Sequence, residues 1–134
     1  MRLALLILAT LLHTGEWTPV EVTATAYCPG VCCCGPRAVG LTADGTDVAD
    51  WPYGVAVDPT RIPYGTPIII PAGLGYLDRQ SPEERLFYAD DSGGIIRRLT
   101  RSTGRVHVDL RFRQHRNAAL FGRKNITILV WSDQ

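Results

Sequence analysis

The sequence predicts an all-β domain folded as a closed six-stranded β-barrel with one short helix. Three observations predict this class. Short strand-like segments recur along the chain, glycine- or proline-containing turns separate most of them, and a single short segment has helical character. The 134 residues suit one domain, long enough to bury a core without disulfides or metals. The net charge of +1 provides no bulk field favouring nucleic acid or an acidic surface.

Six segments have the composition of strands. They are short and rich in Val, Ile, Thr, Phe and Tyr, which favour the pleated conformation. They cover residues 20–27, 54–58, 67–71, 86–89, 105–112 and 126–131. The helical segment covers residues 114–121 and ends before Gly122.

The segment 105–112 has the clearest pattern, because apolar and polar residues alternate along it. Val108 and Leu110 fall on one face of the expected strand, and Asp109 falls on the other. We therefore expect a half-buried strand that presents Asp109 away from the core. An alternative is that Asp109 is a surface residue paired with Arg105 or Arg111.

The N-terminus has the features of a secretory leader. Arg2 precedes an apolar run over residues 3–12. A membrane span needs roughly 20 apolar residues, so this run is too short for one. We predict a signal peptide over residues 1–19, a domain over residues 20–134, and secretion to the periplasm or cell envelope. The alternative is an N-terminal strand or a misplaced start codon.

Four cysteines, Cys28, Cys32, Cys33 and Cys34, fall within seven positions. An exported chain would oxidise some of them. A local disulfide from Cys28 to one of the other three is the preferred pairing, because adjacent cysteines pair only with strain. A zinc site is an alternative, although zinc ligands usually come as two separated pairs. Free thiols are the third possibility. We therefore predict a disulfide, with no metal and no cofactor.

Acidic residues flank a glycine pair in the centre of the chain. Asp90 and Asp91 precede Gly93 and Gly94, and Asp109 follows 18 positions after Asp91 (109 − 91). A carboxylate on a rigid strand beside a glycine-rich turn can face a ligand at close range. The alternative for Asp91 is a turn aspartate that bonds the glycine amides.

Several motifs occur in a fixed order. They are Thr42-Ala43-Asp44-Gly45-Thr46, Val55-Ala56-Val57-Asp58-Pro59, Asp91-Ser92-Gly93-Gly94-Ile95-Ile96-Arg97 and Val108-Asp109. In this order they resemble the 3D domain, named for its three aspartates, which is found in bacterial cell-wall lytic enzymes of the MltA and resuscitation-factor type. The three aspartates correspond here to Asp58, Asp91 and Asp109. The resemblance covers about residues 23–131.

The resemblance implies a double-psi β-barrel whose aspartates converge on one groove. It also implies a peptidoglycan lytic transglycosylase that cleaves the bond between N-acetylmuramic acid and N-acetylglucosamine. Asp109 matches the position of the acid and base, and Asp91 would raise its pKa, orient it or stabilise positive charge on the sugar. The expected substrate-binding residues are Asp58, Gly93, Gly94, His107 and Thr42. For Asp58, capping the turn before Pro59 is an equal alternative.

The implied partner is the peptidoglycan glycan strand, bound by a monomer with no nucleic acid and no membrane span once the leader is removed. Two features depart from the family pattern. Arg97-Arg98 replaces Lys-Gly, and the connection from Asp91 to Asp109 is longer, with an extra loop expected at residues 99–104. Two other functions therefore stay open. One is a non-catalytic wall-glycan-binding or loosening module like the barrel half of expansins, and the other is a two-carboxylate polysaccharide hydrolase.

Overall fold

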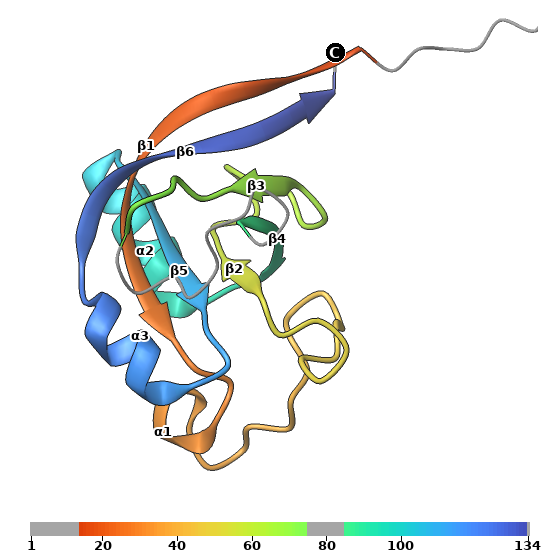
Figure 1. The fold of residues 1–134 in the computed structure, drawn as a ribbon, viewed down its shortest axis with the longest axis vertical. Helices are drawn as coiled ribbons and strands as arrows, with labels where there is room; N and C mark the ends of the chain where they lie inside the picture. Colours follow the sequence, from red (N-terminus) through yellow and green to blue (C-terminus); the bar gives the residue numbers. More distant parts are fainter. Residues whose placement is uncertain (1–13, 75–84, 134) are drawn as a thin grey trace, which may run out of the picture.

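The computed structural model describes residues 14–74 and 85–133, and within them the chain forms six strands and three helices (Figure 1). The strands are β1 (Gly15–Tyr27), β2 (Gly54–Ala56), β3 (Pro67–Ile69), β4 (Leu86–Asp91), β5 (Val106–Arg111) and β6 (Lys124–Asp133). The helices are α1 (Val31–Cys34), α2 (Gly94–Thr103) and α3 (His115–Phe121). Each of the six predicted strand segments overlaps one of these strands, and β1, β4 and β6 extend beyond the predicted bounds. The prediction of a mostly-β domain is therefore confirmed.

The strands hydrogen-bond in the order β1-β5-β2-β4-β3-β6, and β6 pairs again with β1, which closes the sheet into a barrel. Two neighbouring pairs are parallel, β1 with β5 and β2 with β4. The first of these pairs joins strands that lie far apart in the sequence, with Thr25 opposite Asp109. This pairing brings the polar faces of β1 and β5 together.

The barrel interior is filled by one face of each strand. Val22 and Ala24 of β1 and Val108 and Leu110 of β5 are fully buried, as the alternation in the sequence predicts. The remaining core residues share this apolar character and include Val55, Val57, Ile68, Ile70, Phe87, Ala89 and Ile128. Below them, Phe121 of α3 packs against Phe112, with ring centroids 5.7 Å apart.

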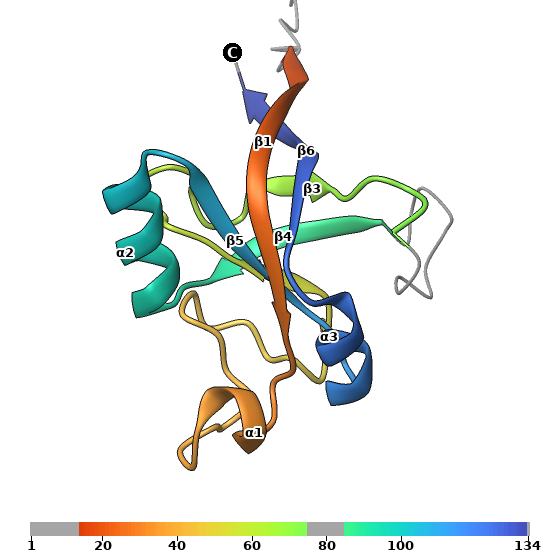
Figure 2. The ribbon, with the colours of Figure 1, turned by 90° about the vertical axis from the view of Figure 1, so that its left-hand side faces the viewer.

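The prediction of a single helix is wrong. The predicted helix is α3, but α2 replaces both the turn expected at Gly93-Gly94 and the loop expected at residues 99–104. The cause is an amphipathic pattern: Ile96 and Thr100, one turn apart, are buried, whereas the arginines between them are exposed. Gly104 ends α2 with a left-handed φ of 72°. Figure 2 shows α2 against one side of the barrel, with α1 and α3 near one end.

At the other end, β1 and β6 extend beyond the barrel as a two-stranded ribbon (Figure 1), with Trp17 against Trp131 at a centroid distance of 5.2 Å. The predicted leader, residues 1–19, falls mostly outside the described residues, and the part from Gly15 onward lies in β1. The leader therefore stays a prediction. Within residues 14–74 and 85–133, no helix has the length and apolar character needed to cross a membrane.

Candidate active site

The polar face of β5 is covered at both ends and open in the middle. At one end, α2 covers His107, whose backbone N–H donates to the Thr100 hydroxyl at 3.0 Å and whose side chain is only 4% exposed. At the other end, Arg111 is completely buried. Between them, Asp109 remains partly accessible. The three side chains lie on one face of β5, because they occupy every second position of the strand. Asp109, the middle one, is therefore a carboxylate at an opening between two buried residues.

The Asp109 carboxyl group accepts a hydrogen bond from a hydroxyl group and forms no ion pair with the residues that the structure describes. Thr25, opposite it on β1, donates from Oγ1 to Asp109 Oδ1 at 2.9 Å. Among residues 14–74 and 85–133, no cationic side chain forms an ion pair with it, so the pairing with Arg105 or Arg111 considered from the sequence does not form. Burial raises the pKa of Asp109 to about 6, helped by the negative charge of Asp91 and opposed by the Thr25 hydrogen bond. A carboxyl group with this pKa can both give and take a proton near neutral pH.

Asp91, the last residue of β4, is held in place by three donors. The Tyr27 hydroxyl donates to Oδ2 at 2.6 Å, and the backbone N–H groups of Ala43 and Ser92 donate to Oδ1 at 3.0 and 2.9 Å. The turn interaction with the Gly93 and Gly94 amides is therefore replaced by contacts to a strand, a loop and the next residue. All three donors fix the carboxylate in one orientation.

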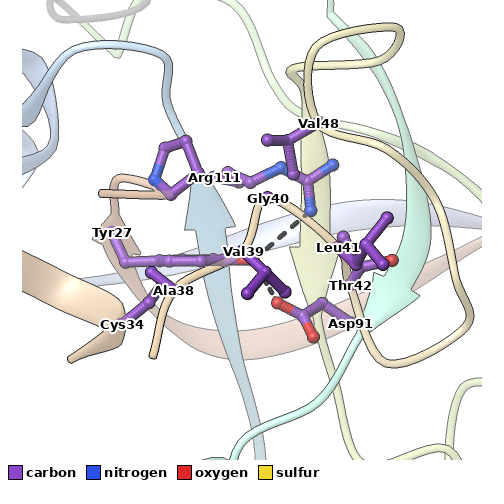
Figure 3. A pocket seen from close by; sticks show the side chains of 11 residues that line it. Tyr27, Cys34, Ala38, Val39, Gly40, Leu41, Thr42, Val48, Asp91 and Arg111 are labelled. Carbon is purple, nitrogen blue, oxygen red and sulfur yellow. Dashed lines mark hydrogen bonds between the residues drawn. The ribbon is translucent and has the colours of Figure 1, made fainter. Parts of the chain in front are cut away.

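A buried hydrogen-bond network supports Asp91 through Tyr27. Figure 3 shows Arg111 donating to the Tyr27 hydroxyl, at 3.3 Å, and this hydroxyl donating to Asp91. Arg111 also donates two hydrogen bonds to the Asp90 carboxylate, at 2.8 and 2.7 Å. Its two remaining N–H groups donate to the carbonyl groups of Trp51 and Pro52. All five donors of the guanidinium group are thus satisfied. Burial and Asp91 raise the pKa of Tyr27, so its hydroxyl stays a donor to that carboxylate.

The ion pair of Asp90 and Arg111 explains Gly54 in β2. A Cβ at this position would overlap the Asp90 carboxylate and the Arg111 guanidinium group. Only glycine lets the buried pair lie against the strand backbone.

Two open depressions meet at Asp109. One, of about 490 Å³, is lined by the first turn of α2 together with Thr25, His107 and Arg123. The other, of about 360 Å³, is lined by Tyr27, Asp91 and the segment after α1. Cys33, Gly93 and Asp109 line both depressions, which therefore form one continuous groove. We call this the Asp109 groove. A third, smaller cavity of about 40 Å³ lies next to it, beside Tyr27, Thr42 and Asp91 (Figure 3).

The structure brings most of the predicted site residues to this groove. Asp91, Asp109, Gly93, Gly94 and His107 all line it. His107 Nε2 lies 3.3 Å from the Thr103 hydroxyl, and burial together with Arg123 and Arg105 lowers the pKa of this histidine.

Thr42 and Asp58 lie elsewhere. Thr42 donates to Asp44 at 2.8 Å and accepts from the Thr46 N–H, so it shapes the loop whose Ala43 contacts Asp91. Asp58 is buried and paired with Arg101 of α2 at 2.8 Å, which holds the pKa of this carboxyl well below its usual range. It does not line the Asp109 groove. Asp58 acts on the groove indirectly, by fixing the helix that forms one wall.

The predicted disulfide does not form in the structure. All four cysteines are free, and Cys28 Sγ lies 3.1 Å from Cys32 Sγ and 3.4 Å from Cys33 Sγ. An S–S bond is about 2.05 Å long. Instead, Cys28, Cys32 and Cys33 gather around the imidazole ring of His115.

Sequence reasoning did not assign four residues that shape the site, namely Thr25, Tyr27, Asp90 and Arg111. A signal was present for the first two, because they alternate with the buried residues of β1 and so share its polar face. The partner of that face could not be predicted from periodicity, since β1 pairs with β5 across a separation of 84 positions.

Comparison with known proteins adds one finding. A family model described as the 3D domain matches residues 53–132. This range contains Asp58, Asp91 and Asp109, while Thr25, Tyr27 and the cysteines lie before it. No curated protein matches the chain.

Proposed function

This chain belongs to the 3D domain family, and from that premise we propose that it is a peptidoglycan lytic transglycosylase. In this proposal it cleaves the bond between N-acetylmuramic acid and N-acetylglucosamine in cell-wall turnover, after export to the periplasm or cell envelope. The barrel would be of the double-psi type, which the two parallel strand pairs within a closed six-stranded barrel support.

One observation carries the proposal. Asp109 lies where the two depressions of the groove meet, with no ion-pair partner among the described residues and a pKa raised to about 6. Glycosidic cleavage needs an acid that keeps its proton near neutral pH until the leaving oxygen receives it. Asp109 has the environment that such an acid requires.

The reaction needs one proton-transfer group. Asp109 gives its proton to the bridging oxygen as the bond from this oxygen to C1 of the muramic acid breaks. The carboxylate then takes the proton of the C6 hydroxyl, whose oxygen bonds to C1. The product is a 1,6-anhydro end, and Asp109 returns to its protonated form without the entry of water.

The other groove residues support this step. Asp91 is fixed by three donors, so its negative charge can stabilise the positive charge that develops on the sugar ring. The same charge raises the pKa of Asp109. Gly93 and Gly94 let a sugar approach the backbone at the start of α2, where no side chain caps the helix.

A second candidate is a two-carboxylate hydrolase, which is favoured by the presence of Asp91 and Asp109 in one depression. In that mechanism Asp91 would act on water or on the sugar. The two reactions differ in product, because hydrolysis leaves a reducing end and the transglycosylase leaves an anhydro end lighter by one water.

The experiment is digestion of purified peptidoglycan followed by mass spectrometry of the soluble products. We expect anhydro-muropeptides from the wild-type protein and a loss of about 10²- to 10⁴-fold in Asp109→Asn. Asp50→Asn is the matched control, because Asp50 is exposed and outside the groove. Reducing ends would support the hydrolase. Unchanged turnover in Asp109→Asn would remove this residue from the mechanism.

A wild-type protein that binds several wall types without releasing products would contradict both enzymes. It would favour the wall-binding or loosening module instead. Circular dichroism of each variant shows whether the fold is retained.

A further inference from the structure

Four metal-ligating side chains meet at the end of the barrel where β1 and β5 finish. The two strands are parallel neighbours, with Tyr27 opposite Arg111, and the Phe112 N–H donates to the Tyr27 carbonyl at 2.9 Å. The chain therefore leaves both strands side by side. Cys28 follows β1 directly and precedes α1, and His115 begins α3 a few residues after β5. Figure 2 shows α1 and α3 together at this end.

The donor atoms are close enough to share one ion. His115 Nδ1 lies 3.7 Å from Cys28 Sγ, 3.4 Å from Cys32 Sγ and 3.6 Å from Cys33 Sγ. Cys28 Sγ lies 3.1 and 3.4 Å from the other two sulfurs, and all four atoms fall within 4.8 Å of one another.

These separations match the edges of a zinc tetrahedron. Zn–S bonds of about 2.3 Å and Zn–N bonds of about 2.0–2.1 Å, at tetrahedral angles, place sulfur and nitrogen about 3.5 Å apart and two sulfurs about 3.8 Å apart. The three nitrogen–sulfur distances lie within about 0.2 Å of the expected edge, and the two sulfur pairs are shorter by less than about 0.7 Å. Small side-chain rotations would complete the site.

We propose that Cys28, Cys32, Cys33 and His115 bind one Zn²⁺ ion. Three thiolates and one imidazole nitrogen are a donor set that selects zinc, and four protein ligands leave no open position. The ion is therefore structural. Cys34 is not a ligand, because its Sγ faces the Cys28 carbonyl oxygen at 3.4 Å.

The zinc ion would fix a segment that has no core of its own. α1 is a single turn of four residues, none of them buried. Its Cys33 lines both depressions of the Asp109 groove. A zinc ion joining α1 to α3 would hold that wall of the groove in position, whatever reaction the groove performs.

This proposal replaces the sequence prediction of a local disulfide without a metal by the zinc site that the sequence analysis named as an alternative. The cysteine spacing alone did not favour zinc, because the cysteines form one cluster rather than two pairs. The fourth donor comes from His115, which lies 82 positions after Cys33, and the barrel topology is what joins them. A disulfide from Cys28 would use two of the four donors and remove the site.

The test is the zinc content of the full chain, purified without chelators and measured by elemental analysis. We expect one zinc per chain in the wild-type protein and in Cys34→Ser, which is the matched control. Cys32→Ser and His115→Ala are expected to lose the ion. Both substitutions change exposed side chains, so neither removes a core residue. Replacing zinc with Co²⁺ in the wild-type protein should give the absorption bands of tetrahedral cobalt bound to thiolates.

Two further measurements distinguish a bound zinc ion from a disulfide. A chelator should lower the Tm of the wild-type protein to that of Cys32→Ser and leave the Tm of Cys32→Ser unchanged. Thiol titration of the denatured, unreduced protein with chelator should find four thiols. Two thiols and no zinc would show a disulfide and overturn the proposal. Equal zinc content in Cys34→Ser, Cys32→Ser and His115→Ala would overturn the ligand assignment.

Discussion

Two carboxylates close to β5, those of Asp90 and Asp109, have different hydrogen-bond partners. Asp90 meets Arg111, which donates to both of its oxygens in a fully buried pair. Asp109, two positions before Arg111 on the same face of the strand, meets only the Thr25 hydroxyl. Burial raises the pKa of both carboxyl groups, but at Asp90 the Arg111 guanidinium group opposes this shift, whereas at Asp109 only a hydroxyl group does so. Asp90 is therefore suited to hold the barrel together, and Asp109 to exchange a proton.

Asp58 extends the comparison to a third carboxylate. Arg101 and Thr60 both donate to it, and its pKa is lowered, whereas the pKa of Asp109 is raised. The three aspartates that define the family resemblance thus do not share one role. Asp58 holds α2, while Asp91 and Asp109 face the groove.

The largest expected effect comes from breaking the buried ion pair. Arg111→Met leaves the Asp90 carboxylate buried without its partner, so the free energy of unfolding should fall by about 3–5 kcal/mol. Urea denaturation followed by circular dichroism measures this change. Arg98→Met is the control, because Arg98 is exposed, and should change stability by less than about 0.5 kcal/mol. A loss in Arg111→Met as small as that of the control would mean that the pair does not hold the barrel.

Substitution of Asp109 is expected to change the free energy of unfolding in the opposite direction, by stabilising the protein. The folded-state pKa of Asp109 is raised from 3.8 to about 6, so the wild-type protein loses stability as pH rises through this range. Asn does not titrate and escapes that loss. Asp109→Asn should therefore be more stable than wild type at pH 8, by up to about 3 kcal/mol, and equal to it below about pH 4.

Asp58→Asn gives the contrast to this result. Because the pKa of Asp58 is lowered, its ionised form stabilises the fold above about pH 4. The substitution should destabilise the protein at pH 8, and the difference should disappear as the pH falls. Urea titrations at a series of pH values compare both variants with wild type. The same sign at pH 8 for Asp58→Asn and Asp109→Asn would contradict the distinction between a structural and a reactive carboxylate.

Most of the fold could be predicted from local patterns. β5 is the clearest case, because its alternation placed Asp109 opposite the core. α2 was missed although its pattern was present, since the Gly93-Gly94 pair favoured a turn and a loop was expected at residues 99–104. Its helical period becomes visible only when Ile96, Thr100 and the terminal Gly104 are considered together.

The site was less accessible to sequence reasoning, because it depends on contacts between distant segments. Asp91 and Asp109 could be proposed from their residue types and spacing. The contact of Thr25 with Asp109 and the contact of Tyr27 with Asp91 depend on the parallel pairing of β1 with β5 and on the closure of the barrel. His115 meets the cysteines for the same reason. Periodicity predicts which face a side chain lies on, but not which strand becomes its neighbour.

The smallest expected effect is a shift in the pH dependence of cleavage, and it tests the groove most directly. The value of kcat/KM should fall above about pH 6 as Asp109 loses its proton. Asp91→Asn removes a negative charge that raises the pKa of Asp109, so the fall should begin at lower pH. Thr25→Val removes the hydrogen bond that lowers this pKa, so the fall should begin at higher pH. Each shift should be less than about one pH unit, equivalent to about 1.4 kcal/mol.

Muropeptide release measured against pH for both variants, with Asp50→Asn as the control, gives the comparison. Because the two substitutions move one pKa in opposite directions, no general loss of stability can produce both results. An alkaline limb at the same pH in all three variants would mean that a group other than Asp109 supplies the proton.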